Sequence, residues 1–409
     1  PAYTSEGLET YDQDFRESKY WRVIEEIMVS DEKNANKEAL NALERGATGI
    51  LFYLQGSENL NVLLEGIEIQ FIRLRLVVEE DPAPLAESLE KIINARGLKA
   101  SELDIFFNHD PLENLARSGN WFDSEDGDFQ ILKQLLSLSE KGIDALSINV
   151  NLFANSGATA AQQLGIALSM IYETHFKLGS EELEKYWVNF AIGSNYFMEI
   201  AKLRAFRRLF NQLSSELDGQ AGDPIIYAET ALRNKSIKDV YNNMIRTTAE
   251  TMAAVIGGAD EVLVRSFDFT LGDSSDFGER VARNQQHVLH YESHLSEVQD
   301  IAAGSYFLEE LTEDLAEKGW EYFKNIEEHG GYTATLKSDW LQSEVESAAR
   351  QEQTQYSNEE KVLVGVNKFT REDKDLSKLL SRPMFTSTNS QEHNIRPIRM
   401  KRLAEDFEK

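Results

Sequence analysis

Eight short apolar runs, separated by longer helix-like segments, constrain the fold of this sequence more than any other feature. Each run is rich in β-branched and aromatic residues, which predicts a buried strand. The amphipathic segments between them predict helices, and strands that alternate with helices form a parallel sheet. Eight strands are the number that closes a (β/α)₈ barrel. The runs are residues 47–54, 68–78, 103–112, 145–153, 187–197, 224–230, 261–268 and, more weakly, 295–301.

The domain organisation expected from this rhythm has three parts. Residues 45–330 should form the (β/α)₈ barrel, since this length suits eight strand and helix units. Residues 1–44 are expected to form an N-terminal arm with one helix, and residues 331–409 a polar C-terminal extension. The helix-like segments include 128–142, 160–179, 197–217 and 241–258.

Charge and cysteine content exclude several classes of function. The chain has 42 Lys and Arg against 70 Asp and Glu, so its formal charge of -28 repels a nucleic-acid backbone. It has no cysteine, which rules out disulfides, thiolate metal sites and cysteine nucleophiles. No apolar run approaches the eighteen residues of a membrane span. We therefore expect a cytoplasmic protein with neither nucleic acid nor membrane as a partner.

Two groups of side chains have a spacing that could ligate a metal ion. The histidines would lie on one helix face, but no carboxylate beside them completes a known zinc motif, and an amphipathic helix face explains them as well. The aspartates follow a predicted strand, where the glycine and serines between them indicate a turn. The two groups are His287, His290 and His294, and Asp268, Asp273 and Asp276.

Three further features could bind or react. Tyr227 and Glu229 should project to the same side of one strand and could form an acid/base pair, although a structural hydrogen bond explains them too. Residues 156–159 open a helix directly after a strand, where free N–H groups could hold an anion or Ser and Thr could simply cap the helix. A basic cluster near the C-terminus is typical of a solvated helix face or docking contact rather than a nucleotide site. It comprises Arg396, Arg399, Lys401 and Arg402.

Several stretches resemble the methylmalonyl-CoA mutase family in order and spacing. The longest, SDFGERVARNQQHVLHYESHLSEVQDIAAGSYFLEELTEDLAEKGW (275–320), is the most specific. The resemblance implies a (β/α)₈ barrel that encloses an acyl-CoA, with adenosylcobalamin bound by a separate C-terminal domain. The other stretches are SGATAAQQL (156–164), FAIGSNYFMEIAKLRAFRRL (190–209), DVYNNMIRTTAETMAAVIGG (239–258), VGVNKF (364–369) and, more loosely, NKEALNALERGATGILF (36–52).

The resemblance also implies that the usual catalytic side chains are replaced. Active members have a histidine beside the substrate thioester, and aligning the Gly-Ala-Thr at 157–159 places Leu152 there. By the same matching, Lys185 and Trp187 stand for an Arg and a Ser that face the substrate, and Tyr227 and Glu229 stand for a His and a Gln. These larger side chains should fill the hollow that an active barrel leaves for its ligand.

Cobalamin binding is also not expected of this chain. The family's cobalt-binding motif is Asp-x-His-x-x-Gly, and His393 is the only histidine in the expected extension. It has neither the Asp two residues before it nor the Gly three residues after it. The extension is also too short for a doubly wound cobalamin domain.

Bacterial members of the family include heterodimers in which a homologous small subunit does no chemistry. The resemblance therefore implies a non-catalytic small subunit that stabilises a cobalamin-binding large subunit, the chain that interconverts (R)-methylmalonyl-CoA and succinyl-CoA. In isolation such a chain should expose an apolar patch and could form a homodimer. Two alternatives stay open: an acyl-CoA-binding or sensing protein, and a cobalamin-free enzyme that uses Tyr227 and Glu229.

Overall fold

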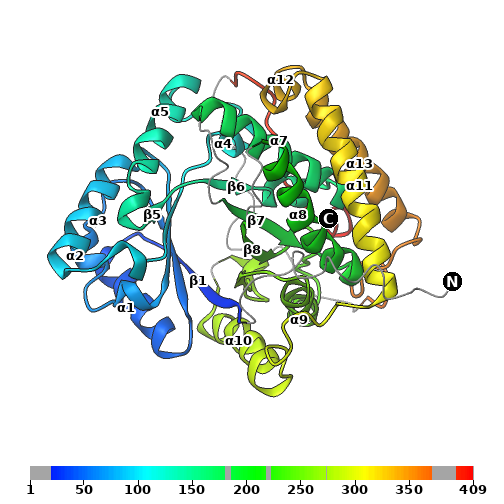
Figure 1. The fold of residues 1–409 in the computed structure, drawn as a ribbon. Coiled ribbons are helices and arrows are strands. Elements are labelled where there is room, and N and C mark those ends of the chain that lie inside the picture. The colour runs from blue at the N-terminus through cyan, green and yellow to red at the C-terminus, as the bar shows by residue number, and fades with distance from the viewer. Residues whose placement is uncertain (1–19, 180–185, 218–222, 273, 371–392, 409) are drawn as a thin grey trace.

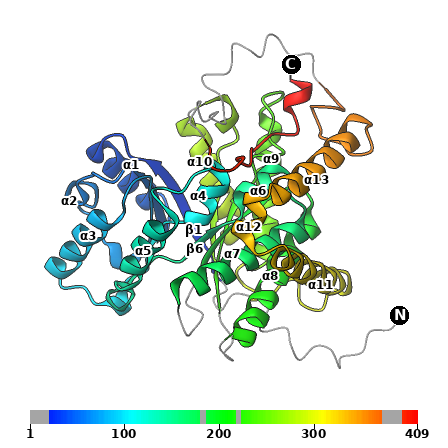
Figure 2. The same cartoon turned by 90° about the horizontal axis from the view of Figure 1, so that it is seen from above.

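Nine parallel strands form one curved sheet in the computed structural model, which describes residues 20–179, 186–217, 223–272, 274–370 and 393–408. Their order across the sheet is β5-β4-β3-β2-β1-β9-β8-β7-β6, with helices on the outside (Figures 1 and 2). The strands are β1 (Arg22–Met28), β2 (Gly49–Leu54), β3 (Arg73–Val78), β4 (Ile105–Asn108), β5 (Ile143–Asp144), β6 (Ser147–Asn149), β7 (Trp187–Ile192), β8 (Ile225–Thr230) and β9 (Glu261–Leu263).

The two ends of this sheet are consecutive pieces of the chain. β5 pairs with β4 and β6 pairs with β7, and only Ala145 and Leu146 separate β5 from β6. β1 pairs with both β2 and β9, so the sheet is continuous on the opposite side. β5 and β6 together therefore take the place of one barrel strand that is interrupted in the middle. The architecture is of the TIM-barrel type, which confirms the predicted fold class.

One predicted strand was wrong, and two strands, β1 and the two-residue β5, were missed. The weak run at 295–301 forms turns after a π-helix (Val288–Glu292), not a strand. The strand that replaces it is β1, which lies inside the expected arm of residues 1–44. Two adjacent glutamates interrupt its apolar pattern. Glu25 pairs with Arg283 and Glu26 with Arg265, and these ion pairs compensate the charges that the strand carries.

The predicted helices are present with shifted ends. α11 packs across α7 and α8 on the outside of the barrel (Figure 1). Glycine allows this close approach, since a Cβ on Gly165 would lie 2.7 Å from the backbone N of Phe323. The helices are α1 (Glu32–Glu44), α2 (Leu60–Leu63), α3 (Ala83–Arg96), α4 (Pro111–Ser118), α5 (Glu125–Leu136), α6 (Asn151–Ser156), α7 (Ala160–Leu178), α8 (Tyr196–Leu217), α9 (Tyr241–Ile256), α10 (Asp276–His287), α11 (Tyr306–Glu328), α12 (Tyr332–Lys337) and α13 (Trp340–Ser357).

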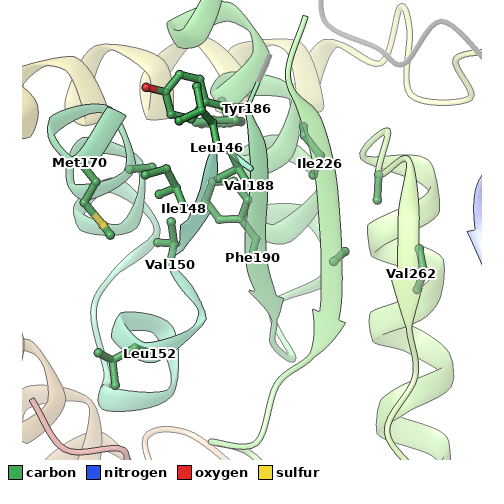
Figure 3. Close-up of a cluster of buried hydrophobic side chains, with 14 of the residues drawn as sticks. Leu146, Ile148, Val150, Leu152, Met170, Tyr186, Val188, Phe190, Ile226 and Val262 are labelled. Atoms are coloured by element: carbon green, nitrogen blue, oxygen red, sulfur yellow. The ribbon is translucent and has the colours of Figure 1, made fainter. Parts of the chain in front are cut away.

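The buried apolar side chains form a large outer core, a smaller cluster of strand residues, and a third cluster where the end of α13 meets the C-terminal tail. The outer core lies between the sheet and the helices, where Ile148, Val188 and Phe190 pack near Met170 of α7 (Figure 3). The alternation of side chains along a strand places the smaller cluster on the opposite face of the sheet, inside the barrel. Within the described ranges, no helix is long and apolar enough to span a membrane.

Candidate functional site

The axis of the barrel is occupied by large side chains from strands all around the sheet. They form one buried cluster, against which Tyr53 and Val77 also pack. Its members are Ile24, Leu51, Phe106, Trp187, Ile225, Tyr227 and Leu263. In a TIM-type barrel of this kind, inward side chains fill the interior as a packed core rather than line a pore.

Trp187 and Tyr227 form the centre of this interior cluster. Both are fully buried, and their rings stack with centroids 4.6 Å apart and an interplanar angle of 21°. The indole Nε1 of Trp187 donates to Oε2 of Glu261 at 3.0 Å, and Nε of Arg75 donates to the same oxygen at 3.1 Å. Burial raises the pKa of Glu261, but the charge of Arg75 and its hydrogen bonds hold it below the ordinary value. The barrel interior therefore contains an ion pair between Arg75 and Glu261, and the indole of Trp187, which stacks on Tyr227, donates a hydrogen bond to it.

A polar layer follows at the carboxyl ends of the strands, where barrel enzymes place their chemistry. Glu229 accepts hydrogen bonds from Nδ2 of Asn189 at 2.7 Å and Nδ2 of Asn151 at 2.8 Å. It also pairs with Nη2 of Arg265 at 2.8 Å, and Arg265 pairs in turn with Glu26. Three donors engage the carboxylate of Glu229, so it is a structural ion rather than a free base.

Tyr227 does not complete an acid/base pair with Glu229. Within the described part of the chain, its buried hydroxyl has no hydrogen-bond partner. Burial, assisted by the charge of Glu229, raises the pKa of Tyr227 well above that of a free phenol. In this geometry the Tyr227 hydroxyl and the Glu229 carboxylate share no hydrogen bond among the described residues.

The unpartnered hydroxyl leads to a stability prediction. Replacing Tyr227 with Phe should leave the free energy of unfolding unchanged or raise it by up to about 1 kcal/mol, because a buried hydroxyl without a partner costs desolvation energy. Urea denaturation of both proteins measures the difference. Tyr332→Phe is the matched control, since the buried Tyr332 hydroxyl donates to the carbonyl of Leu112 at 3.1 Å. That variant should lose about 1 kcal/mol. A larger loss in Tyr227→Phe would contradict the assignment.

The other predicted family positions lie outside the interior cluster or outside the described residues. Leu152 belongs to α6, because β6 ends at Asn149 and the expected strand 145–153 does not continue. It is buried in the outer core, beside Val150 (Figure 3). Lys185 falls in the range 180–185, outside the described residues. That Leu152, Lys185, Trp187, Tyr227 and Glu229 replace catalytic side chains stays a prediction.

The corner at 156–159 caps a helix and does not offer an anion site. The N–H groups of Gly157 and Ala158 donate to the carbonyls of Ala154 and Phe153. The N–H of Thr159 donates to Oε1 of Gln162 at 2.9 Å, and Thr159 Oγ1 accepts from the N–H of Gln162. The N-cap interpretation is therefore confirmed for Thr159, and the N–H groups of Gly157, Ala158 and Thr159 are already used.

Neither group of side chains with a possible metal-ligand spacing forms a metal site among the described residues. In the part of the chain that the structure describes, no three His, Asp or Glu side chains are placed to hold a metal ion. His290 packs edge-on against Tyr20 and Trp21. Asp268 accepts from Oγ of Ser266 at 2.6 Å, which is the expected turn chemistry, and Asp273 lies outside the described residues.

The basic cluster forms ion pairs along an extended segment, so a solvated helix face is the wrong description. Arg396 pairs with Asp339 at 2.6 Å and with Glu346. Arg402 pairs with Glu408 at 2.7 Å. These contacts hold the segment against α13 and the loop after β8.

Asp110, at the carboxyl end of β4, makes the stability of the fold depend on pH. Burial, with the charge of Glu113, raises its pKa to about 7 against the lowering effect of three backbone N–H donors. The pKa of an aspartate in an unfolded chain is about 3.9. The folded state therefore binds the proton more tightly, and this contribution to stability is present below about pH 4 and is lost as pH rises through about 7.

Replacing Asp110 with Asn should flatten that dependence. The Asp110 carboxyl contributes at most about 1.4 kcal/mol per pH unit to the slope of unfolding free energy between about pH 4 and 7. This contribution should be absent when the variant is denatured at a series of pH values. Asp31→Asn is a matched control, because Asp31 caps the start of α1 in an exposed position. An unchanged slope in Asp110→Asn would rule out the assignment.

Sequence reasoning missed the buried ions of the barrel. Arg75, Glu261, Arg265 and Glu26 all lie on or beside strands with their charges directed inward. A signal was present, since charged residues alternate with apolar ones in RLRLVV and EVLVR. A charge at such a position normally indicates a solvent-facing side. Only the three-dimensional pairing reveals that these side chains face each other.

His393, the histidine compared with the cobalt-binding motif, lies at the start of the described tail. The Nδ1 atom of His393 is buried, and the described residues give it no hydrogen-bond partner. The next two backbone N–H groups donate to the carbonyl of Gly119 at 3.1 Å. That this chain does not bind cobalamin stays a prediction.

Comparison with known proteins decides the family. The family model described as methylmalonyl-CoA mutase matches residues 46–409. The chain belongs to the methylmalonyl-CoA mutase family. Its relatives include the methylmalonyl-CoA mutase small subunit of Porphyromonas gingivalis, 31% identical over 85% of this chain and 59% of the relative. The small subunit of Streptomyces virginiae is 32% identical over 85% of this chain and 58% of the relative.

More distant members of the family align over less of their length. The methylmalonyl-CoA mutase of Rhizobium meliloti is 29% identical over 77% of this chain and 46% of the relative. The chain thus spans less than two thirds of the relatives that it matches. A solved aldolase, QR15, covers 66% of this chain and 96% of its own at a TM-score of 0.35 and 10% identity, which is too distant to inform the site.

Proposed function

We propose that this chain is a non-catalytic small subunit of a heterodimeric methylmalonyl-CoA mutase. Its partner is the catalytic large subunit, which binds adenosylcobalamin and interconverts (R)-methylmalonyl-CoA and succinyl-CoA. The chain acts by stabilising that partner. Two relatives named as small subunits of the mutase, each at least 31% identical, support this assignment.

The observation that carries the proposal is the filled barrel interior. Trp187, Tyr227 and Phe106 occupy the axis along which an acyl-CoA would have to pass. Glu261 and Arg75 neutralise each other there, and the stacked aromatic pair packs against them. A close-packed interior has no room for a substrate unless large side chains move.

Co-expression with the large subunit tests the proposal. We expect a stable one-to-one complex by sizing and native mass spectrometry, with cobalamin bound only by the large subunit. Methylmalonyl-CoA turnover should require the large subunit and be absent for this chain alone. Turnover by the isolated chain, or the lack of any complex, would refute the proposal.

A variant distinguishes a supporting role from a catalytic one. Tyr227→Phe in this chain should leave the turnover of the complex within about twofold, because the hydroxyl contacts no reacting group in this account. Removal of a general acid or base typically costs about a hundredfold or more. A loss of that size, with complex formation intact, would favour an enzymatic role for this barrel.

A further inference from the structure

The solvent-facing sides of α9 and α10 form an apolar surface on the outside of the barrel. The two helices follow neighbouring strands, β8 and β9, and lie side by side (Figures 1 and 2). Five large apolar side chains of these helices, including the π-helix that continues α10, are between 43% and 70% exposed. We call this surface the α9/α10 face. It comprises Tyr241, Ile245, Phe277, Val281, Val288 and Tyr291.

The apolar side chains of the two helices lie next to the line along which α9 and α10 meet. Nε2 of Gln285 on α10 donates to Oγ1 of Thr248 on α9 at 2.6 Å. Residues three or four apart lie on the same side of a helix. Ile245 lies three residues before Thr248, so it is on the side of α9 that borders α10. Val281 and Val288 lie four residues before and three after Gln285, so they are on the side of α10 that borders α9.

Aromatic contacts join the two helices at their N-terminal ends. The ring of Phe267 contacts the rings of both Tyr241 and Phe277, with centroid separations of 5.4 and 5.8 Å. Tyr291 lies at the other end of the face, three residues after Val288. The exposed apolar side chains therefore form one continuous surface, and contiguous apolar patches of this kind mark interaction sites.

The α9/α10 face is poor in charge, although the chain has a formal charge of -28. Glu250 is the only carboxylate of α9, and it is buried against Lys235 at 2.7 Å. Residues 281–291 contain no Asp or Glu, and Arg283 within them is buried and pairs with Glu25. An acidic chain repels other acidic surfaces, so a protein partner can approach this face at the least electrostatic cost.

Charged side chains border the face at the start of α10. Arg280 lies over the ring of Phe277, 5.6 Å from its centroid, and Asp276 and Glu279 are exposed beside it. By contrast, the solvent-facing side of α11 is rich in Asp and Glu along its whole length. Stable protein interfaces have an apolar centre that is depleted of charge and enriched in tyrosine, with a polar rim around it. The α9/α10 face has this composition.

We propose that the α9/α10 face binds the large subunit of the mutase. This inference rests on the heterodimer proposal, and it adds which surface of this chain makes the contact. The face is the exposed apolar patch that an isolated small subunit should have, and the relatives named as small subunits are the reason to expect a different chain on it. The large-subunit surface that covers it should be apolar at its centre and poor in carboxylates, because a carboxylate buried there would meet no cation.

Co-expression of the full chain with the large subunit tests this surface, with a dilution series and native mass spectrometry to measure the dissociation constant. The double variant Ile245→Glu, Tyr291→Glu should weaken the complex at least about a hundredfold, because each substitution places an unpaired charge inside the contact. Both side chains are largely exposed in the isolated chain, so the variant should fold, and thermal melting checks this. Amide exchange of α9 and α10 should also slow when the large subunit binds.

Phe71→Glu, Phe176→Glu is the matched control. It adds the same two charges at exposed aromatic residues, one just before β3 and one on α7. Its affinity for the large subunit should stay within about twofold of that of the unmodified chain.

The outcomes separate this assignment from the heterodimer proposal. If the complex forms and the two double variants bind the large subunit equally well, the α9/α10 face is not the contact, while the heterodimer proposal stands. If the unmodified chain forms no complex, the heterodimer proposal fails and this assignment fails with it. Self-association that only the α9/α10 variant abolishes, with the heterodimer intact, would assign the face to a second copy of this chain and overturn the assignment.

Discussion

Replacing Arg75 with Met should lower the free energy of unfolding by about 3–5 kcal/mol. The side chain of Glu261 is fully buried, and Arg75 is its main counter-ion through Nε at 3.1 Å and a second contact from Nη2. Methionine fills similar volume but leaves the carboxylate unpaired in the barrel interior, with only the more distant Arg73 at 3.8 Å. The cost of an uncompensated buried charge exceeds the loss of packing. Urea denaturation of the two proteins measures it.

A second substitution should restore part of the stability that Arg75→Met loses. Combining Arg75→Met with Glu261→Gln removes the stranded charge, so the double variant should recover part of the loss. Lys318→Gln is the surface control, because Lys318 pairs with Asp314 at 3.9 Å and both side chains are largely exposed. That variant should change stability by no more than about 0.5 kcal/mol. A loss under about 1 kcal/mol in Arg75→Met would mean that the interior is hydrated.

Replacing Trp187 with Ala should also destabilise the fold by about 3–5 kcal/mol. The indole is fully buried, stacks on Tyr227 and donates to Glu261, so its removal leaves a large void and an unfilled acceptor position. The surrounding strands cannot collapse into that void without breaking their register. Thermal or chemical denaturation gives the difference.

Trp187→Phe separates packing from hydrogen bonding in the same place. Phenylalanine keeps an aromatic ring against Tyr227 but cannot donate to Glu261, so its loss should be smaller, about 1–2 kcal/mol. Trp340→Phe on the outer helix α13 is a matched control, since Trp340 is only partly buried. If Trp187→Ala were as stable as Trp187→Phe, the ring would not be filling the barrel.

A strand could be predicted from the sequence where both of its faces, one toward the barrel interior and one toward the helices, are mainly apolar. β7 and β8 are buried at every position and are mostly apolar or aromatic apart from Asn189, Glu229 and Thr230. β7 begins at the predicted residue and β8 one residue after it. β1 could not be recognised, because Glu25 and Glu26 break its pattern and their partners Arg283 and Arg265 lie far along the chain. Such long-range ion pairs leave no local signature in the sequence.

The interior could be predicted only in part. The family resemblance predicts that Trp187 and Tyr227 fill the barrel, and both belong to the interior cluster. The ion pair of Arg75 and Glu261 could not be foreseen, since inward charges in a strand look like solvent-facing ones.

Hydrogen exchange of the Trp187 indole N–H tests most directly whether side chains fill the barrel interior. The chain has five tryptophans, so Trp187→Phe identifies the signal in a heteronuclear NMR spectrum. We predict that this N–H exchanges slowly and that its chemical shift is unchanged by saturating methylmalonyl-CoA, because it donates to Glu261 inside a packed core. Fast exchange, together with a shift when methylmalonyl-CoA is added, would contradict the account.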